Sequence, residues 1–390
     1  MSSATLKAPE ASPLIKTKIL ILSDTHGMTL AEKMPSQSAD ICVHCGDLTE
    51  ESKLDEFRAT LELLRAIEAP LKLVIAGNHD FTLDTSSFRK KIEEARPQIE
   101  PELVAKVYGE YEEARRLLLD AKRDGIHLLD EGSHRFSLQN GAKLTVYASP
   151  YTPSLGDWGF QYRPDQGHKF SIEEGTDLAI THGPPRGILD RTNSRERAGC
   201  PDLFAAVAMA KPRIHCFGHI HEGWGAKMVT WREKLTEKPS HFTDIDNDRS
   251  FVVEQLSTMQ SGKFDSPEDT KRKEEKASKY ATQMFCDTSH CDGDVAPLES
   301  GKQTLFVNAA IKGDDDMPVQ PSWLVEVGLP RADTTEEPDE PEQIGEATLG
   351  RKRTLDTDEA ESEERPPTNR RRLSASGRAK ESGSSNILCY

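Results

Sequence analysis

Short apolar stretches alternate with polar blocks along most of the chain, and each apolar stretch has the length of a β-strand. Continuous apolar runs of this length, bounded by polar or glycine-containing segments, are typical of strands that are buried on both faces. The pattern therefore predicts strands at 19–22, 39–43, 71–76, 126–129, 144–148, 178–180, 214–217, 304–311 and 322–327.

Two segments between these strands have helical periodicity instead. Leu54, Phe57, Leu61, Leu64 and Ile67 recur at helical spacing and give a helix one apolar face. A second helix is predicted over 103–123, which contains three consecutive leucines at 117–119. Because strands separated by helices are typical of layered folds, we expect an α/β domain.

Composition along the chain divides it into unequal parts. Residues 1–16 are rich in Ser, Ala and Pro and are expected to form a disordered leader, followed by one domain over 17–330. Within that domain, residues 233–302 form a low-complexity insert that we expect to be partly helical and largely solvated, since a long insert costs little loop-closure entropy. Residues 331–390 are rich in charge and proline and predict a disordered tail.

The overall charge restricts the partners of the protein. The 390 residues carry a formal net charge of −16 at pH 7, and 35% of them are hydrophobic. Since non-specific affinity for nucleic acid depends on Lys and Arg replacing counterions, long DNA or RNA is not expected to bind. No apolar run reaches the roughly 18 residues that indicate a membrane span, so no membrane partner is expected.

Several features bear on localisation. The N-terminal segment lacks the apolar core of a signal peptide, and seven scattered cysteines argue against a disulfide framework, so a cytoplasmic location is expected. Arginine and lysine clusters at 351–353 and 370–372 resemble a two-part nuclear import signal and leave a nuclear location open. Ser374 follows three arginines and is a candidate kinase site, whereas the sequence does not indicate an oligomeric state.

The polar blocks that directly follow five of the predicted strands contain the candidate chemistry. Strand ends in α/β sheets gather ligands at one edge, so Asp, Asn and His side chains at these positions are expected to converge. Carboxylate, amide oxygen and imidazole together suit divalent cations such as Mn, Fe, Zn, Mg or Co. The blocks are Asp24-Thr-His26, Gly46-Asp47, Gly77-Asn78-His79-Asp80, Thr181-His182-Gly183 and Gly218-His219-Ile220-His221.

Such a ligand set predicts a hydrolase with two metal ions. Two cations about 3.5–4 Å apart lower the pKa of a shared water and stabilise charge on phosphoryl oxygens, so that hydroxide is available near neutral pH. Asp47 is the best candidate for a bridging ligand because a carboxylate offers two oxygens. Asn78 offers a neutral oxygen, which limits the negative charge that faces an anionic substrate.

The same blocks resemble a known family. The order DTH, GDLT, GNHD, THGPP and GHIH is similar to that of the calcineurin-like metallophosphoesterases. Longer matches, among them SDTHG, AGNHDFTLD, THGPPRGILD and GHIHEGWG, resemble the metallophosphoesterase-domain-containing group. The likeness spans roughly residues 17–330. It implies a four-layer α/β/β/α sandwich of two packed mixed β-sheets, and binuclear-metal-dependent hydrolysis of small phosphodiesters or phosphomonoesters, with cyclic nucleotides among the candidate substrates.

The resemblance also implies roles by position. It assigns the first metal ion to Asp24, His26, Asp47 and His221, and the second to Asp47, Asn78, His182 and His219. His79 is expected to contact the phosphoryl group and to assist the leaving oxygen, with Asp80 orienting it as the second catalytic residue. Substrate contacts are expected from His26, Asn78, His79, Gly183, Pro184 and Trp158.

Trp158 and its neighbour Phe160 have two open interpretations. Either aromatic ring could stack on a nucleobase at the rim of the site, or both could pack against the domain. Cys42 and Cys45 form a C-x-x-C pair inside a predicted strand, where alternate residues face opposite sides, so buried packing is favoured over a redox or zinc site. A zinc site at Cys286, His290 and Cys291 is disfavoured, because no second pair lies at zinc-finger spacing.

Three alternative functions remain open at this point. A serine/threonine protein phosphatase would share the metal ligands, but those enzymes continue the second block with an arginine where this chain has Glu51. A nuclease of the same superfamily is disfavoured by the acidic charge. A nucleotide-binding regulatory or scaffold protein with little turnover is the third alternative, and the histidine pair His219 and His221 argues against it.

Overall fold

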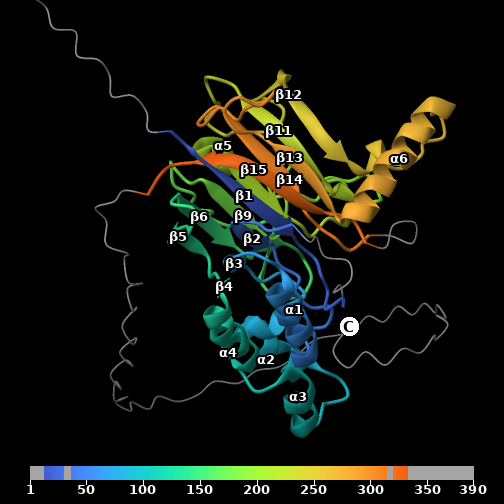
Figure 1. Ribbon diagram of the computed structural model, residues 1–390. Helices are drawn as coiled ribbons and strands as arrows, with labels where there is room; N and C mark the ends of the chain where they lie inside the picture. The colour runs from blue at the N-terminus through green and yellow to red at the C-terminus, as the bar shows by residue number, and fades with distance from the viewer. Residues whose placement is uncertain (1–12, 30–36, 314–318, 333–390) are drawn as a thin grey trace, which may run out of the picture. The chain divides into compact units, whose positions relative to one another are not determined.

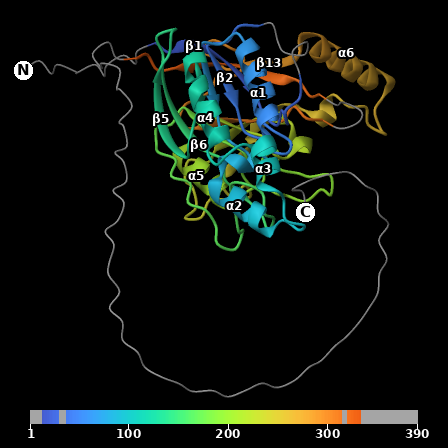
Figure 2. The ribbon, with the colours of Figure 1, turned by 90° about the horizontal axis from the view of Figure 1, so that it is seen from below.

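The computed structural model describes residues 13–29, 37–313 and 319–332. The predictions made for most of the leader, for the charge clusters at 351–353 and 370–372, and for Ser374 lie outside these residues. Within the described residues, two mixed β-sheets pack against each other, with helices on their outer faces (Figures 1 and 2). This arrangement confirms the predicted four-layer α/β class.

The first sheet has six strands in the order β13-β15-β1-β2-β3-β4. Strands β1 to β4 run parallel to one another, and β15 pairs antiparallel with β1. The bounds are β1 (Ile15–Leu22), β2 (Ile41–His44), β3 (Leu71–Val74), β4 (Ile126–Leu128), β13 (Phe285–Ser289) and β15 (Ser322–Leu329).

The second sheet has seven strands in the order β12-β11-β14-β10-β9-β6-β5. Its central strands β14, β10, β9 and β6 are parallel, and antiparallel pairs close both edges. The bounds are β5 (Gly132–Ser137), β6 (Lys143–Ser149), β9 (Leu178–Thr181), β10 (Ile214–Phe217), β11 (Gly225–Trp231), β12 (Ile245–Gln255) and β14 (Gln303–Asn308). A separate parallel pair joins β7 (Thr152–Pro153) and β8 (Gln161–Tyr162).

The helices lie outside the two sheets. Figure 1 shows α1 to α4 gathered at the bottom of the view and α6 projecting at the upper right. The bounds are α1 (Leu54–Ala66), α2 (Thr85–Glu94), α3 (Pro101–Tyr108), α4 (Glu113–Asp120), α5 (Pro201–Ala210) and α6 (Pro267–Gln283), with short 3₁₀ turns at Phe81–Leu83, Ala121–Asp124, His221–Gly223 and Leu256–Thr258. None of the helices in the described part of the chain is long and apolar enough to cross a membrane.

Alternate residues of the parallel strands pack into different apolar layers. In β1, Ile19 and Ile21 face the layer between the two sheets, whereas Leu20 and Leu22 face the layer under α1 and α4. A third cluster, which includes Phe204 of α5, covers the outer face of the second sheet. Both faces of the central strands are therefore buried, which explains why their sequences are continuously apolar rather than alternating.

The structure corrects three details of the predicted organisation. The helix expected over 103–123 is interrupted at residues 109–112, because Gly109 and Glu112 both adopt positive φ and end one helix before the next begins. The insert at 233–302 contains the solvated helix α6, but it also contributes an edge strand to each sheet, β12 and β13. β1 already begins at Ile15, inside the expected leader.

Candidate metal centre

The candidate ligands lie at the carboxyl ends of five parallel strands. In the first sheet, the neighbouring strands β1, β2 and β3 lead into Asp24, Asp47 and Asn78. In the second sheet, the neighbours β9 and β10 lead into the loops of His182 and His219. A short bridge between Ser23 and Ala310 joins the sheets beside these loops. The two sets of strand ends therefore meet at a common edge.

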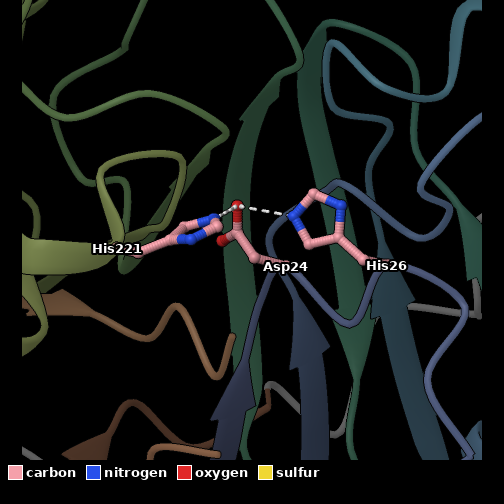
Figure 3. A group of neighbouring side chains, drawn as sticks. All are labelled: Asp24, His26 and His221. Atoms are coloured by element: carbon pink, nitrogen blue, oxygen red, sulfur yellow. Dashed lines mark ion pairs between the residues drawn. The ribbon is translucent and has the colours of Figure 1, made fainter. Parts of the chain in front are cut away.

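The first group of side chains consists of Asp24, His26 and His221 (Figure 3). Oδ1 of Asp24 lies 3.3 Å from Nε2 of His221 and 4.0 Å from Nε2 of His26. Asp24 and His26 are buried, whereas His221 is partly exposed. One carboxylate and two imidazole nitrogens within 4.8 Å of one another are a suitable donor set for a divalent cation.

The second group consists of Asp47, His182 and His219. Nε2 of His182 lies 3.3 Å from Oδ2 of Asp47 and 2.9 Å from Oδ1 of Asn78, so the amide oxygen belongs to the same cluster. The other nitrogen of His182, Nδ1, lies 2.9 Å from the carbonyl oxygen of Cys45. Because only an N–H can bond to a carbonyl, this contact keeps a proton on Nδ1, and Nε2 is the nitrogen that would bind a metal after giving up its own proton.

Asp47 lies between the two groups. Its Oδ2 is 3.3 Å from Nε2 of His182, which belongs to the second group, and 3.8 Å from Nε2 of His26, which belongs to the first. Its other oxygen accepts the backbone N–H of His79 at 2.8 Å. Asp47 is thus the residue that can serve both groups at once.

The backbone at these positions is unusual. Asp24, His26, Asp47 and His219 have φ values of 57°, 46°, 53° and 67°. Residues other than glycine rarely occupy this left-handed region, and the conformation costs on the order of 1–3 kcal/mol per residue. Four of the seven candidate ligands adopt this unfavourable backbone conformation, and it directs their side chains toward the site.

Two glycines allow the loops to approach closely. A Cβ atom on Gly218 would lie 1.9 Å from Oδ2 of Asp24, and one on Gly77 would lie 2.2 Å from Oδ1 of Asp47. No side chain fits at either distance. The glycines of the blocks around His219 and Asn78 are therefore required so that two strand ends can share one edge.

The buried imidazole of His26 provides a direct test of whether the residues fit a metal ion. Its Nε2 makes no hydrogen bond, although the side chain is buried. Nε2 lies 3.8 Å and 4.0 Å from the carboxylates of Asp47 and Asp24, which is too long for a hydrogen bond and compatible with an ion coordinated by both residues. An unsatisfied buried nitrogen among carboxylates fits a cation site.

The protonation states of the site follow from burial and from opposite charges. Burial raises the pKa of Asp24, but the hydrogen bond and positive charge of His221 outweigh this effect and lower the pKa. Burial lowers the pKa of His182, but the carboxylate of Asp47 outweighs it and raises the pKa to about 9. Burial and the neighbouring His182 lower the pKa of His219 to about 4, which favours the neutral, metal-binding form.

The structure changes the role expected of Asp80. Instead of contacting the ring of His79, the carboxylate of Asp80 accepts the backbone N–H groups of Gly77, Leu48 and Thr49 and the hydroxyl of Thr49. The imidazole Nδ1 of His79 instead lies 2.6 Å from the backbone carbonyl of Glu50. Asp80 therefore braces the loops of Asp47 and His79 against each other and does not orient the imidazole.

Glu50 and Lys312 adjoin the candidate site and were not among the residues predicted from the sequence. The carboxylate of Glu50 lies 3.2 Å from Nδ1 of His26 and pairs with the ammonium of Lys312. The close approach of the His26 imidazole is the main cause that lowers the pKa of Glu50 to about 2. Histidine ligands commonly donate their second nitrogen to a carboxylate in this way. An acidic residue three positions after Asp47 was the available signal for Glu50, whereas nothing near Lys312 in the sequence indicated its role.

The residues expected to contact substrate are found in different surroundings. Gly183 is next to His219, since a Cβ on it would lie 4.0 Å from Cδ2 of that ring. Pro184 is buried, and its carbonyl accepts the N–H of Cys200 at 3.0 Å. The indole of Trp158 lies against the imidazole of His79, with 4.4 Å between ring centroids. Trp158 thus already has a partner within the protein.

The six cysteines in the described part of the chain are buried. Cys42 and Cys45 belong to separate apolar clusters on opposite faces of the first sheet. His290, between Cys286 and Cys291, bonds through its two nitrogens to Thr288 and to the carbonyl of Ala296. Among the described residues, the groups that could hold a metal ion do not include these cysteines.

Comparison with known proteins agrees with this geometry. The family profile described as calcineurin-like phosphoesterase matches residues 17–223, about half of the chain. Metallophosphoesterase domain-containing protein 1 from Homo sapiens is 34% identical over 220 residues, as is its counterpart from Mus musculus. Probable rhamnogalacturonate lyase C from Emericella nidulans is 33% identical over 217 residues.

These matches cover only parts of the proteins compared. The human and mouse matches span 54% of this chain and 62% of the relative, so less than two thirds of the relative's length is covered. The match to the lyase spans 55% of this chain and 18% of that protein. Among solved structures, purple acid phosphatase PPD1 from yellow lupin aligns with 82% of this chain and 55% of its own, at 9% identity and a TM-score of 0.29.

Proposed function

The chain belongs to the calcineurin-like phosphoesterase family, and we propose that it hydrolyses small phosphodiesters or phosphomonoesters, cyclic nucleotides included, with two divalent metal ions. The observation that carries the proposal is the position of Asp47, whose Oδ2 lies 3.3 Å from Nε2 of His182 and 3.8 Å from that of His26. One carboxylate between two donor groups is the arrangement that a pair of ions would share.

The donor set supports particular ligands for each ion. Asp24, His26 and His221 would hold the first ion, and Asn78, His182 and His219 the second, with Asp47 shared by both. Bound there, the two ions would neutralise phosphoryl charge and activate a water for attack on phosphorus. Nitrogen and oxygen donors in this mixture suit Mn, Fe, Zn, Mg or Co.

His79 would act on the substrate itself. Its Nδ1 bonds to the carbonyl of Glu50, which keeps a proton on Nδ1 and leaves Nε2 as the atom available to a phosphoryl or leaving oxygen. Its backbone N–H bonds to Asp47, so the imidazole is tied to the residue proposed to bridge the ions. A protonated imidazole in this place would donate a proton to the departing oxygen.

The same residues argue against the protein phosphatase alternative. Glu51 occupies the position at which those enzymes have a phosphate-binding arginine, and it pairs with Lys53. Neighbouring Glu50 is engaged with His26 and Lys312. The loop therefore lacks the guanidinium with which those enzymes hold the phosphate group.

The test combines metal analysis with a substrate panel. Purified protein loaded with each candidate metal is expected to bind two ions and to hydrolyse bis-p-nitrophenyl phosphate or a cyclic nucleotide. Asp47→Asn is expected to lose at least one ion and the metal-dependent turnover, while Asp165→Asn on an exposed loop is the matched control that keeps both. Retained turnover in Asp47→Asn, or hydrolysis of phosphoproteins with small esters ignored, would overturn the proposal.

A further inference from the structure

The indole of Trp158 lies against the imidazole of His79 with its plane tilted by 32° and 4.4 Å between ring centroids. We propose that Trp158, supported by the buried ammonium of Lys91, is a positioning residue for His79 and not a platform for a nucleobase. This inference rests on the proposed function, because it matters for turnover only if His79 acts on the substrate.

A second contact is needed because one hydrogen bond does not fix a ring. The bond from Nδ1 of His79 to the carbonyl of Glu50 determines where one ring atom lies, but the imidazole can still tilt about it. The indole restricts that tilt by covering a face of the ring. The imidazole of His26 packs nearly perpendicular to His79, with 4.8 Å between ring centroids and an interplanar angle of 86°. The two aromatic contacts and the hydrogen bond together define one orientation.

The segment that carries Trp158 is fastened to the loop that carries His79. The N–H of Gly159 donates to the carbonyl of Asn78 at 3.0 Å, and the N–H of Phe160 donates to the carboxylate of Asp84 at 3.1 Å. A Cβ on Gly159 would lie 2.7 Å from the Cα of Phe81, so the two backbones are in direct contact. Trp158 therefore moves with His79 and keeps its place on the ring.

Lys91 of α2 supports the indole from within the protein. The residue is only 7% exposed, and its Nζ lies 4.8 Å from the centroid of Trp158 and 5.1 Å from that of Phe81. The carboxylate of Asp157 lies 3.7 Å from this Nζ. A buried ammonium is costly unless it is paired, and here aromatic faces provide part of the stabilisation. The cation thus fixes the indole at the place where it meets His79.

This arrangement makes a different prediction from nucleobase stacking. A nucleobase platform would matter for nucleotide substrates and would be seen mainly in KM. A positioning residue acts through His79, so its loss lowers kcat for every substrate by a similar factor and leaves KM nearly unchanged. The two roles can be separated by comparing a nucleotide with a p-nitrophenyl ester.

The kinetic test is a double-mutant cycle between Trp158 and His79 on the metal-loaded full chain. Trp158→Ala is expected to lower kcat by ~10- to 100-fold for bis-p-nitrophenyl phosphate and for a cyclic nucleotide alike. Trp158→Phe should restore most of the rate, and Trp158→Ala should cost nothing more in a His79→Ala background. Lys91→Met should lower kcat for both substrates by a smaller factor. The controls Leu155→Ala, in the same exposed loop as Trp158, and Lys90→Met should leave kcat unchanged.

A spectroscopic readout separates this inference from the proposed function. In protein with labelled histidine, the indole ring current should shift the ring protons of His79, and the shift should disappear in Trp158→Ala. If the chain has no turnover with any metal, the proposed function fails while this shift still tests the positioning. A loss confined to nucleotides, additive losses in the cycle, or an unchanged His79 resonance in Trp158→Ala would overturn the inference.

Discussion

The backbone amide of His219 donates to both carboxylate oxygens of Asp24, each at 3.1 Å, and so ties the end of β10 in one sheet to the end of β1 in the other. Both residues have positive φ, and Gly218 lies between their backbones without room for a side chain. This contact closes the edge at which the two ligand groups meet. Disturbing it should affect both metal binding and stability.

Gly218→Ala tests this contact. Its Cβ would lie 1.9 Å from Oδ2 of Asp24 and 2.2 Å from Oγ of Ser23, so the carboxylate must move. We expect the loss of at least one bound ion and a fall of ~2 kcal/mol in the free energy of unfolding, as for other overpacked sites. Elemental analysis and chemical denaturation measure the two effects. Gly262→Ala, whose nearest contact is a surface side chain at 3.2 Å, should change neither, and an unaltered metal content in Gly218→Ala would contradict the prediction.

Glu50→Gln tests whether this carboxylate prepares His26 for a metal. The amide keeps the size of the side chain and leaves the backbone carbonyl that contacts His79, but it removes the charge opposite Nδ1 of His26. We expect metal affinity to fall ~10- to 100-fold, the range seen when residues that orient a ligand are changed. Calorimetric titration with Mn²⁺ or Zn²⁺ measures the affinity. Lys312→Met, which removes only the partner of Glu50, should have a smaller effect, and equal affinities in all three proteins would rule out this role.

Asp80→Ala separates bracing from catalysis. Removing the carboxylate leaves the N–H groups of Gly77, Leu48 and Thr49 without their acceptor in a buried site. At roughly 1–3 kcal/mol for each unsatisfied donor, we expect a loss of at least about 3 kcal/mol in the free energy of unfolding. Asp130→Ala on the exposed surface should stay within ~0.5 kcal/mol of the parent. A fully stable Asp80→Ala protein with lower kcat would restore the role in orienting His79.

His215 should make the stability depend on pH. Thr181 donates its hydroxyl proton to the carbonyl of Gly183, so it accepts from Nε2 of His215 and leaves the buried Nδ1 unpaired. Burial lowers the pKa of His215 to about 3. Because the unfolded chain binds a proton near pH 6.5 and the folded chain does not, the contribution of this residue is complete above pH 6.5 and is lost as the pH falls toward 3.

The size of that loss is on the order of 3–5 kcal/mol, at 1.36 kcal/mol per pKa unit. His215→Phe keeps a ring of similar size beside Phe217 and Phe306 and has no proton to gain. Its free energy of unfolding, measured by denaturant titration from pH 7 to pH 4, should fall less steeply than that of the parent. The exposed-site control His134→Phe should retain the parent slope, and parallel curves for parent and His215→Phe would show that this residue is not responsible.

Metal removal should destabilise the protein without unfolding it. Each ion, at a free concentration 1,000 times its dissociation constant, would add about 4.1 kcal/mol to the stability of the folded state. Three apolar clusters form independently of the ligand groups, so chelated protein should remain folded with a lower Tm. Differential scanning calorimetry with and without chelator measures the shift. No change in Tm on adding any of the candidate metals would argue against a binding site.

Much of the fold could be predicted from the sequence because it is encoded locally. Continuous apolar runs such as Ile19–Leu22 indicate strands buried on both faces, and the helical spacing from Leu54 to Ile67 indicates α1. The strand ends were equally clear, since Asp24, Asp47 and His182 directly follow apolar runs. By contrast, β12 and β13 were missed, because exposed edge strands lack the apolar runs that mark buried ones.

The sequence by itself determined which residue types stand at the strand ends, and hence the kind of chemistry available to this protein. Only the tertiary structure decided which side chains come into contact. The carbonyl of Glu50, and not Asp80, bonds to the ring of His79, and Trp158 covers a face of that ring. Lys312 pairs with Glu50, which in turn contacts His26. The physical reason is that strand and helix preferences depend on residues that are near one another in the chain. Contacts between side chains far apart in the chain depend instead on how the two sheets pack, and on backbone conformations that the local sequence disfavours.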